Sequence, residues 1–431
     1  MRRRVVEAVE GAPIGDLNDA DLVDLTRARA RLKERLKPRL SLFEDTTAGC
    51  VPRNIVGTIS LNSRTVLRVA PKVGDDQDWV GAALDLMLPE RSSVAGHRQA
   101  ARTGASNSLE DGLAAVYRER LDRALRAEGP IEVMHTEFAH SAALTGRLDV
   151  ERWVLEKPFG QLTFPVHRSV LDANNELTAA LALAAVILSR SVTDGTVRNA
   201  LVKLSRDIRP GLPDSVTVDP SVIGRPLPQQ WSAYNEAWSI AQVVLSNSRF
   251  ASRHGTLSGV EVALEPWILL EELLDRTVRE VVRRGQADGH GWHNKRHPSV
   301  ELLRSDDNPG RDVSLARLLS NRTAYPENLI MGPDGPIASF EAKYSRPKEP
   351  VSIRNHMYQL LTTAAHAGSP RAVLVYPELS EPIHWSTVDS HTPVNDVFAV
   401  GLNLYGYSKH SGVAERAQQI FDLLLHSSSM S

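Results

Sequence analysis

The sequence is poor in cysteine and in long apolar runs. Its single cysteine, Cys50, excludes an internal disulfide framework and any zinc site built from cysteines alone. The longest apolar run, residues 179–188, is shorter than the about 20 residues that cross a bilayer. The charged start, MRRRVVE, lacks the apolar stretch of a secretory signal. We therefore expect a soluble cytoplasmic protein that contacts no membrane.

The sequence also lacks an excess of either charge. It has 50 Lys and Arg residues against 52 Asp and Glu residues, and only 5% of its residues are aromatic. Such a composition is ordinary for a folded protein. At about 150 residues per domain, a chain of 431 residues corresponds to two or three domains. We expect boundaries that divide the chain into residues 1–105, 106–255 and 256–431.

Motifs for nucleotide hydrolysis and for nucleophilic catalysis are missing. There is no G-x-x-x-x-G-K-[ST] phosphate-binding loop, no G-x-G-x-x-G and no G-x-S-x-G. The chain is therefore not expected to hydrolyse a nucleoside triphosphate itself. A small-molecule hydrolase or transferase has no supporting motif either.

Positive charge is concentrated in residues 26–40, TRARARLKERLKPRL, where one acidic residue stands among seven basic ones. A helix capped by Asn18 or the next residue, and ended by Pro38, would spread these cations around its whole circumference. Two interpretations remain open. The segment is either a solvated helix that packs Leu32 and Leu36 inward, or a contact with phosphates or with an acidic partner.

The remaining pattern mixes helices and strands. Two β-branched runs, residues 55–61 and 65–69, flank a polar turn at 62–64 and predict a hairpin. Alternation predicts a strand at 144–154, and the apolar run in residues 371–378 predicts a buried strand. Helices are expected at residues 109–127, 177–188, 233–245, 266–284 and 355–366. Gly285 is expected to lie beyond the end of the helix at 266–284.

Residues 286–298 contain three closely spaced histidines, His290, His293 and His297. This spacing on a helix presents zinc ligands, but the neighbouring glycines and Pro298 favour a polar loop instead.

The segment YPENLIMGPDGPIASFEAKY, residues 325–344, carries the chemistry. Two apolar runs separated by a Gly-Pro-Asp-Gly-Pro turn predict a β-hairpin. Glu327 stands at the start of the first strand. Glu341 and Lys343 stand near the end of the second strand, where alternation puts both on one face. A hairpin of this length brings Glu327 opposite that pair, so that two carboxylates and an amine converge.

Such a group suits a hard divalent cation. Mg²⁺ binds one or two carboxylates and keeps several waters. A bound metal polarises a phosphoryl oxygen and lowers the pKa of its bound water. Lys343 can orient or help deprotonate the attacking water and stabilise the developing charge. These are the parts needed to hydrolyse a phosphodiester.

These residues resemble the signature of the PD-(D/E)xK nuclease superfamily, an acid after proline, a hairpin and then Asp/Glu-x-Lys. Glu327 follows proline where the superfamily has aspartate. A Pro-Asp dipeptide does occur in the turn, at Pro333-Asp334, but we favour Glu327 over Asp334 as the first acid of the signature. The resemblance implies an α/β fold class, α+β in the N-terminal half, with a C-terminal restriction-endonuclease-like core whose mixed sheet is flanked by helices. Tyr358 or Gln359, on the next helix, would approach the metal or the DNA, unless both are ordinary helix surface.

Several segments in a common order also resemble the McrC family, the nuclease subunits of McrBC-type modification-dependent restriction systems. They are VGTISLNSRTVLRVAPK from residue 56, LTGRLD at 144–149, LLE at 269–271, FEAKYSRP from residue 340, MYQLLTTAAHAG from residue 357 and AVLVYPE from residue 372. Family members typically carry D-A-K-Y where this chain has E-A-K-Y.

The resemblance implies a Mg²⁺-dependent DNA endonuclease subunit of a cytoplasmic restriction system that defends against foreign DNA. The catalytic residues would be Glu327, Glu341, Lys343 and Gln359, and the metal would be held at Glu327, Glu341, Ala342 and Glu271. Alternatively, Glu271 does not bind the metal and is a charged residue at the edge of a helix seam. Arg147 and Asp149 are expected to form a structural ion pair rather than a second catalytic site.

The resemblance also implies partners. Family members dock through their N-terminal half on a hexameric McrB-like AAA+ GTPase or ATPase, insert part of it in the ring pore and cut double-stranded DNA in that assembly. Residues 1–105 would be the docking region, 106–255 a mixed middle domain and 256–431 the nuclease domain. The basic stretch and the hairpin at 54–69 are our candidates for the contact. The alternative is a degenerate adaptor that activates the NTPase without cutting, which the glutamate at position 327 favours.

Overall fold

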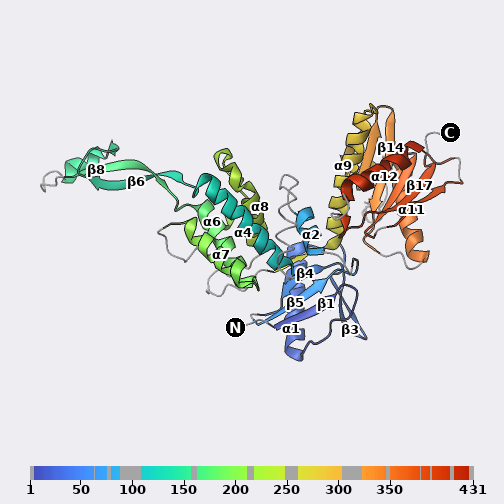
Figure 1. Cartoon of the computed structure of the whole chain (residues 1–431), viewed down its shortest axis with the longest axis horizontal. Helices are drawn as coiled ribbons and strands as arrows, with labels where there is room; N and C mark the ends of the chain where they lie inside the picture. Colours follow the sequence, from blue (N-terminus) through green and yellow to red (C-terminus); the bar gives the residue numbers. More distant parts are fainter. Residues whose placement is uncertain are drawn as a thin grey trace, which may run out of the picture. The chain divides into compact units, whose positions relative to one another are not determined.

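The computed structural model describes most of the chain. The described residues are 4–62, 64–74, 79–87, 108–156, 163–210, 218–247, 261–302, 323–345, 350–378, 380–388, 391–407 and 412–426. The chain divides into two compact units, residues 1–87 with 263–431 and residues 88–262 (Figure 1). Its N-terminal and C-terminal parts therefore share one unit. Within the described ranges, no helix is both long enough and apolar enough to cross a membrane.

The N-terminal part of the first unit is a sheet packed against one helix. Its elements are β1 (Arg4–Val9), α1 (Asp19–Leu36), β2 (Phe43–Thr46), β3 (Gly49–Pro52), β4 (Val56–Ser60), β5 (Thr65–Ala70), α2 (Trp79–Met87) and β9 (Val262–Leu264). The strand order is β1-β5-β4-β9, and the antiparallel pair β4–β5 confirms the predicted hairpin. Asn18 caps α1 as predicted, and Leu32 is fully buried in one core with Ile59 and Leu67.

The C-terminal part of the same unit is a six-stranded mixed sheet with helices. Its elements are α9 (Pro266–Ala287), β10 (His293–Arg296), β11 (Val300–Glu301), β12 (Thr323–Ala324), β13 (Asn328–Gly332), β14 (Gly335–Ala342), α11 (Pro350–His366), β15 (Arg371–Tyr376), β16 (Ile383–Ser386), β17 (Asp396–Gly401) and α12 (Gly412–His426). The strand order is β10-β13-β14-β15-β17-β16, with β14, β15 and β17 parallel.

Hairpin, helix and strand follow one another in this part of the chain as predicted. The hairpin β13–β14 leads into α11, and α11 leads into the buried strand β15. Leu360 and Ala364 of α11 share a core with Ala372 and Leu374, which lie on one face of β15. Helix α12 packs along α9 (Figure 1). The chain therefore has a mixed α/β architecture.

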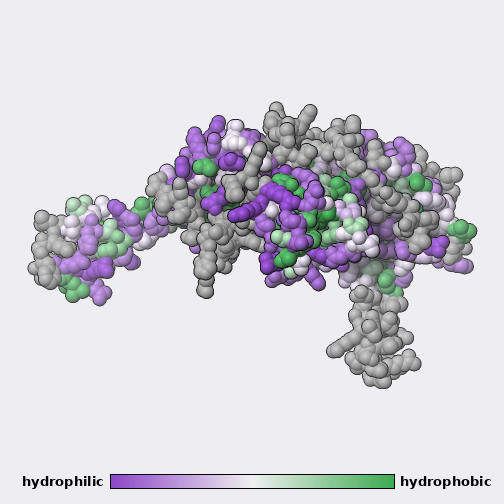
Figure 2. Space-filling model, turned by 90° about the horizontal axis from the view of Figure 1, so that it is seen from below, coloured by the Kyte–Doolittle hydropathy of each residue, from purple (hydrophilic) through white to green (hydrophobic). Residues whose placement is uncertain are grey.

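The second unit combines a helical bundle with a small sheet. Its elements are α4 (Leu109–Glu128), β6 (Val133–Ser141), β7 (Arg147–Leu148), α5 (Val150–Glu156), β8 (Phe164–Asp172), α6 (Glu176–Ser191), α7 (Gly195–Asp207), the 3₁₀ turns η2 (Pro220–Val222) and η3 (Gln229–Tyr234), and α8 (Asn235–Asn247). Helices α4, α6, α7 and α8 pack together and include the three helices predicted here. Met134 and Leu171 of the sheet β6-β8-β7 and Leu155 of α5 are exposed. Figure 2 shows hydrophobic residues scattered among hydrophilic ones on this part of the surface.

The predicted strand at 144–154 is largely wrong. Only Arg147 and Leu148 form a strand, because the next residue, Asp149, caps helix α5, which begins at Val150. The Asp149 Oδ1 atom accepts the Arg152 N–H (3.1 Å), as an N-cap residue does. The Asp149 carboxylate faces His167 (3.3 Å), so the expected ion pair with Arg147 is also wrong.

Two expectations around the end of α9 are wrong as well. The helix continues past Gly285 to Ala287, because the Trp292 ring packs where a side chain would stand. A Cβ atom on Gly285 would lie 2.5 Å from Trp292 Cε3, so only glycine fits there. Residues 293–296, expected in a polar loop, form β10, which pairs with β13.

Candidate functional site

A cavity of about 1220 Å³ in the first unit collects the residues that the sequence singles out. Its walls come from α9, from the end of the hairpin β13–β14, from α11 and from residues near 39 and 54. The candidate site residues that line it are Glu271, Glu327, Glu341, Ala342, Lys343 and Gln359.

The end of the hairpin brings Glu327 across to Glu341. Asn328 pairs with Phe340, and the Glu327 N–H donates to the Phe340 carbonyl oxygen (3.2 Å). The Ala342 N–H donates a short hydrogen bond to the Glu327 carboxylate. Glu341, on the same strand, is only 5% exposed. The Glu327 side chain therefore reaches across to the last residue of β14, beside the buried Glu341.

Lys343 forms a closed triangle of hydrogen bonds with Glu341 and Gln359. Its Nζ donates to Glu341 Oε1 (2.7 Å) and to Gln359 Oε1 (2.9 Å). Gln359 Nε2 donates to the same Glu341 oxygen (2.6 Å). The Lys343 N–H donates to the Val375 carbonyl of β15 (2.8 Å), which fixes the backbone beyond the end of β14. Each member of the triangle thus orients the other two.

A third carboxyl group, that of Glu271, joins this cluster from α9. Burial raises the pKa of Glu271, and Arg39 and Arg296 act against that rise; its side chain also shares a hydrogen bond with Glu327. Burial, together with the negative charges of Glu341 and Glu271, raises the pKa of Glu327 to about 9. Burial and the neighbouring carboxylates therefore favour the neutral, protonated form of Glu327.

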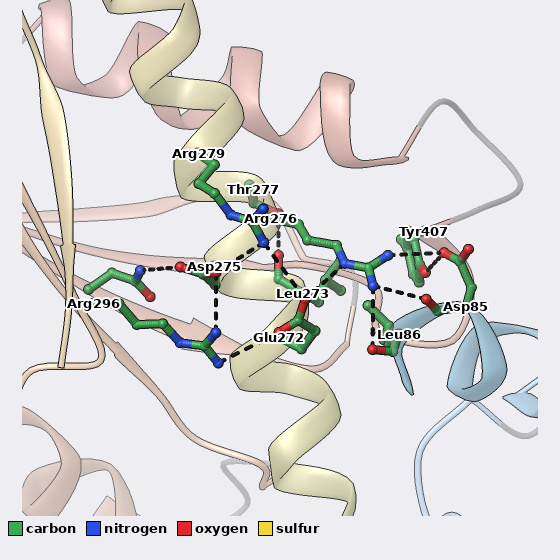
Figure 3. Close-up of polar contacts among 11 residues, drawn as sticks. Asp85, Leu86, Glu272, Leu273, Asp275, Arg276, Thr277, Arg279, Arg296 and Tyr407 are labelled. Atoms are coloured by element: carbon green, nitrogen blue, oxygen red, sulfur yellow. Dashed lines mark hydrogen bonds and ion pairs between the residues drawn. The ribbon is translucent and has the colours of Figure 1, made fainter. Parts of the chain in front are cut away.

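Helix α9 holds the start of β13 through buried polar contacts (Figure 3). The Asp275 carboxylate accepts a hydrogen bond from Asn328 Nδ2 (2.9 Å), and Asn328 directly follows Glu327. The next residue, Arg276, points the other way and donates to the Asp85 carbonyl oxygen of α2 (2.9 Å). The Asp275 contact fixes α9 against the start of β13, next to Glu327, and the Arg276 contact fixes α9 against α2.

The other candidates lie elsewhere or only border the cavity. Asp334, the literal Pro-Asp acid, is exposed in the turn at the opposite end of the hairpin. Tyr358 lines the cavity but is 63% exposed. His290 stacks on Trp292 with ring centroids 5.2 Å apart. Nowhere in the described ranges do three His, Cys, Asp or Glu side chains form a ready set of metal ligands, which leaves the zinc alternative without support.

The donor chemistry of the cavity suits Mg²⁺. The ion needs only one or two carboxylates, because water and phosphate oxygens complete its shell. Glu327 and Glu341 provide two hard oxygen ligands. Burial is the main cause of the raised pKa of Glu327, and the neighbouring Glu341 and Glu271 add to it. The cavity therefore contains the type of oxygen ligand that a divalent cation binds.

Several further cavity residues were not predicted as part of the site, among them Arg39, Trp267, His297 and Tyr344. The sequence marked Arg39 only as one of many basic residues and Tyr344 only as part of E-A-K-Y. Because these residues come from four distant segments, spacing along the chain could not bring them together.

Comparisons with known proteins agree with one another. A family model described as "McrBC 5-methylcytosine restriction system component" matches residues 51–377. No curated protein sequence matches the chain.

Two solved structures have a similar fold. One is a chain of the refined half-complex from a tetradecameric assembly of Thermococcus gammatolerans McrB AAA+ hexamers with bound McrC, with a TM-score of 0.67 and 15% identity over 92% of this chain and 94% of that chain. The other belongs to the cryo-EM structure of the Thermococcus gammatolerans McrBC complex, with a TM-score of 0.50 and 15% identity over 64% of this chain and 88% of that chain.

Proposed function

Because this chain belongs to the family of McrBC 5-methylcytosine restriction system components, we propose that it is the DNA-cutting subunit of such a system. The proposed activity is Mg²⁺-dependent hydrolysis of phosphodiesters in double-stranded DNA. The observation that carries it is the hydrogen-bonded group of Glu341, Lys343 and Gln359 beside Glu327 in one cavity. The order of hairpin, helix and parallel strand supports a PD-(D/E)xK core around this group.

Each side chain has a distinct task in the proposed reaction, an in-line attack of water on phosphorus. When bound at Glu327 and Glu341, Mg²⁺ would polarise a phosphoryl oxygen and lower the pKa of its bound water. Glu327 gives up its proton before it can act as a ligand. Lys343 orients the attacking water and donates to the oxygen on which negative charge develops. Gln359 keeps the Lys343 amine and the Glu341 carboxylate in place.

The proposed partner is an McrB-like AAA+ NTPase ring. The solved structures with a similar fold are described as McrB AAA+ hexamers with bound McrC and as an McrBC complex. The hairpin β4–β5 is largely buried in its own sheet, so it is a poor candidate for the contact. Exposed cations of α1 remain candidates. The sheet β6-β8-β7 is another, because large apolar side chains such as Met134 and Leu171 stay exposed on it.

The test is a Lys343→Ala variant, assayed for cleavage of modified plasmid DNA with Mg²⁺ and the AAA+ partner. We expect cleavage to fall by about a thousandfold, because the variant loses the group that stabilises the developing charge. Stimulation of the partner's NTPase should be unchanged. Lys203→Ala, which removes an exposed lysine of α7, is the matched control and should cut normally.

The competing function is the adaptor that activates the NTPase without cutting. One observation favours it, the hydrogen bond by which the Ala342 N–H occupies the Glu327 carboxylate. Under this alternative the wild-type chain stimulates the NTPase and leaves DNA intact, and Lys343→Ala changes neither result. Cleavage by the wild type that depends on Lys343 rejects it.

A further inference from the structure

One arginine of the basic stretch differs from its neighbours in its surroundings. On α1, Arg27 pairs with Asp24 (3.1 Å) and Arg29 pairs with Asp45 (2.7 Å). Arg31 donates to the Ser60 carbonyl oxygen (2.7 Å). Arg39 instead lines the cavity that contains Glu341, and within the described part of the chain no carboxylate lies at ion-pair distance from it.

The segment that carries Arg39 is held in place by the backbone. Lys37 ends α1 in the left-handed conformation (φ 46°), and Pro38 prevents the helix from continuing. Beyond Arg39, the Leu42 carbonyl oxygen accepts the Arg53 N–H (2.6 Å). The Ser41 carbonyl oxygen accepts Asn54 Nδ2 (3.3 Å). The chain therefore enters and leaves the Arg39 position along a defined path.

Trp267 provides a platform for the Arg39 guanidinium. The Arg39 Cζ atom lies 5.1 Å from the Trp267 ring centroid. The indole is itself oriented, because its Nε1 donates to the buried Glu265 carboxylate (2.8 Å). Trp267 precedes Glu271 by four residues, which is about one turn of α9, so the two side chains lie on one side of the helix. Arg39 is thus held beside the carboxylate cluster.

This arrangement leaves the donor groups of Arg39 available to a ligand. A guanidinium stacked on an aromatic ring keeps its in-plane N–H groups free, and their planar geometry matches the oxygens of a phosphate. Glu271 and Arg39 attract each other through space, but Arg39 does not close on the carboxylate. The cation therefore stands at the wall of the cavity that also contains Glu341 and Lys343.

We propose that Arg39 binds a non-bridging oxygen of a DNA backbone phosphate in the cavity and so acts as a substrate-binding residue that the N-terminal segment contributes to the nuclease site. This inference rests on the proposed function and deepens it, because it makes the site dependent on residues from both ends of the chain. The ligand class is the phosphodiester of duplex DNA. An acidic protein surface is the competing source of the same charge.

The test measures duplex DNA binding in Ca²⁺ as a function of salt, with the chain assembled on its AAA+ partner. Loss of one phosphate contact should reduce the slope of log K against log[salt] by about 0.9. We therefore expect Arg39→Ala to lower that slope by about one unit and to weaken binding by about tenfold. Arg39→Lys should keep most of the slope. Arg283→Ala, which removes an exposed arginine of α9, is the matched control and should behave as wild type.

Cleavage and NTPase assays of the same variants separate the alternatives. Arg39→Ala should cut at least about tenfold more slowly at low DNA concentration, with NTPase stimulation unchanged. If Arg39→Ala shows the same slope of log K against log[salt] as the wild type, the inference is overturned. Normal DNA binding combined with lost NTPase stimulation also overturns it and assigns Arg39 to the protein partner. A wild-type chain that binds DNA but never cuts it rejects the proposed nuclease function alone, since the change in slope still decides the role of Arg39.

Discussion

The two units of the chain place similar ion pairs in very different surroundings. On the surface of α4, Glu119 pairs with Arg123 (2.6 Å) and Asp122 with Arg126 (2.9 Å), each four residues apart. In the cavity of the first unit, Glu341 pairs with Lys343 at almost the same distance (2.7 Å), but their side chains are only 6% and 19% exposed. The distances alone do not distinguish a solvated pair from a candidate active site.

Burial makes the difference. Water and salt screen an exposed pair, so that its two charges contribute little to stability or to each other's ionisation. Inside the cavity, Glu341 and Glu327 lie near one lysine, and the pKa of Glu327 rises to about 9. Charges that are buried close together interact more strongly than solvated ones. The comparison therefore favours the first unit as the place of the proposed chemistry, and three substitutions test it.

The largest expected effect is on cleavage. Glu341→Gln removes a proposed metal ligand and the negative charge that accepts hydrogen bonds from Lys343 and Gln359. We expect cleavage of modified DNA to fall by about a thousandfold, or about 4 kcal/mol of transition-state stabilisation. Glu119→Gln breaks the exposed pair on α4 and should leave the rate unchanged. Equal rates for the two variants would show that burial does not mark the site.

The next effect is on the free energy of unfolding. Asp85 accepts a hydrogen bond from Tyr407 and pairs with the buried Arg276 (3.5 Å, Figure 3). Asp85→Ala removes the Tyr407 hydrogen bond and one of the two carboxylates near that guanidinium, the other being Glu272 (3.1 Å), and we expect the first unit to lose about 3 kcal/mol in urea unfolding. Asp122→Ala removes a surface partner of Arg126 and should cost less than about 0.5 kcal/mol. A loss as small as this for Asp85→Ala would contradict the prediction.

The third effect, measured as a change in melting temperature, is a pH dependence of the metal-free protein. The folded pKa of Glu327, about 9, exceeds its ordinary value of 4.5, so the folded state favours the neutral carboxyl group. The resulting contribution to stability is complete below pH 4.5 and is lost as the pH rises toward 9. The melting temperature of Glu327→Gln should therefore decrease less than that of the wild type between pH 4.5 and 9.

Divalent metal provides the control for this pH dependence. At pH 8, Mg²⁺ should raise the melting temperature of the wild type and release about one proton for each ion bound. It should stabilise Glu327→Gln much less, whereas Glu119→Gln should respond as the wild type does. Equal stabilisation of all three proteins would mean that the ion binds away from Glu327.

Local sequence patterns predicted the elements around the site well. The hairpin at residues 328–342 has strong turn chemistry between two apolar runs, and the helix and the strand after it have clear periodicities. The errors occurred where a tertiary contact outweighed the local pattern. Trp292 keeps Gly285 inside α9, although glycine usually ends a helix. Asp149 starts a helix within a stretch that alternates like a strand.

The sequence by itself determined which residues of the hairpin meet, because strand alternation and the length of the turn place Glu327, Glu341 and Lys343 at one end. It also determined the family resemblance, which the match over residues 51–377 confirms. Only the tertiary structure decided that Glu271, Arg39 and Trp267 border the same cavity. These residues are separated by long stretches of chain, and they meet because the N-terminal and C-terminal parts fold into one unit around a shared set of buried charges.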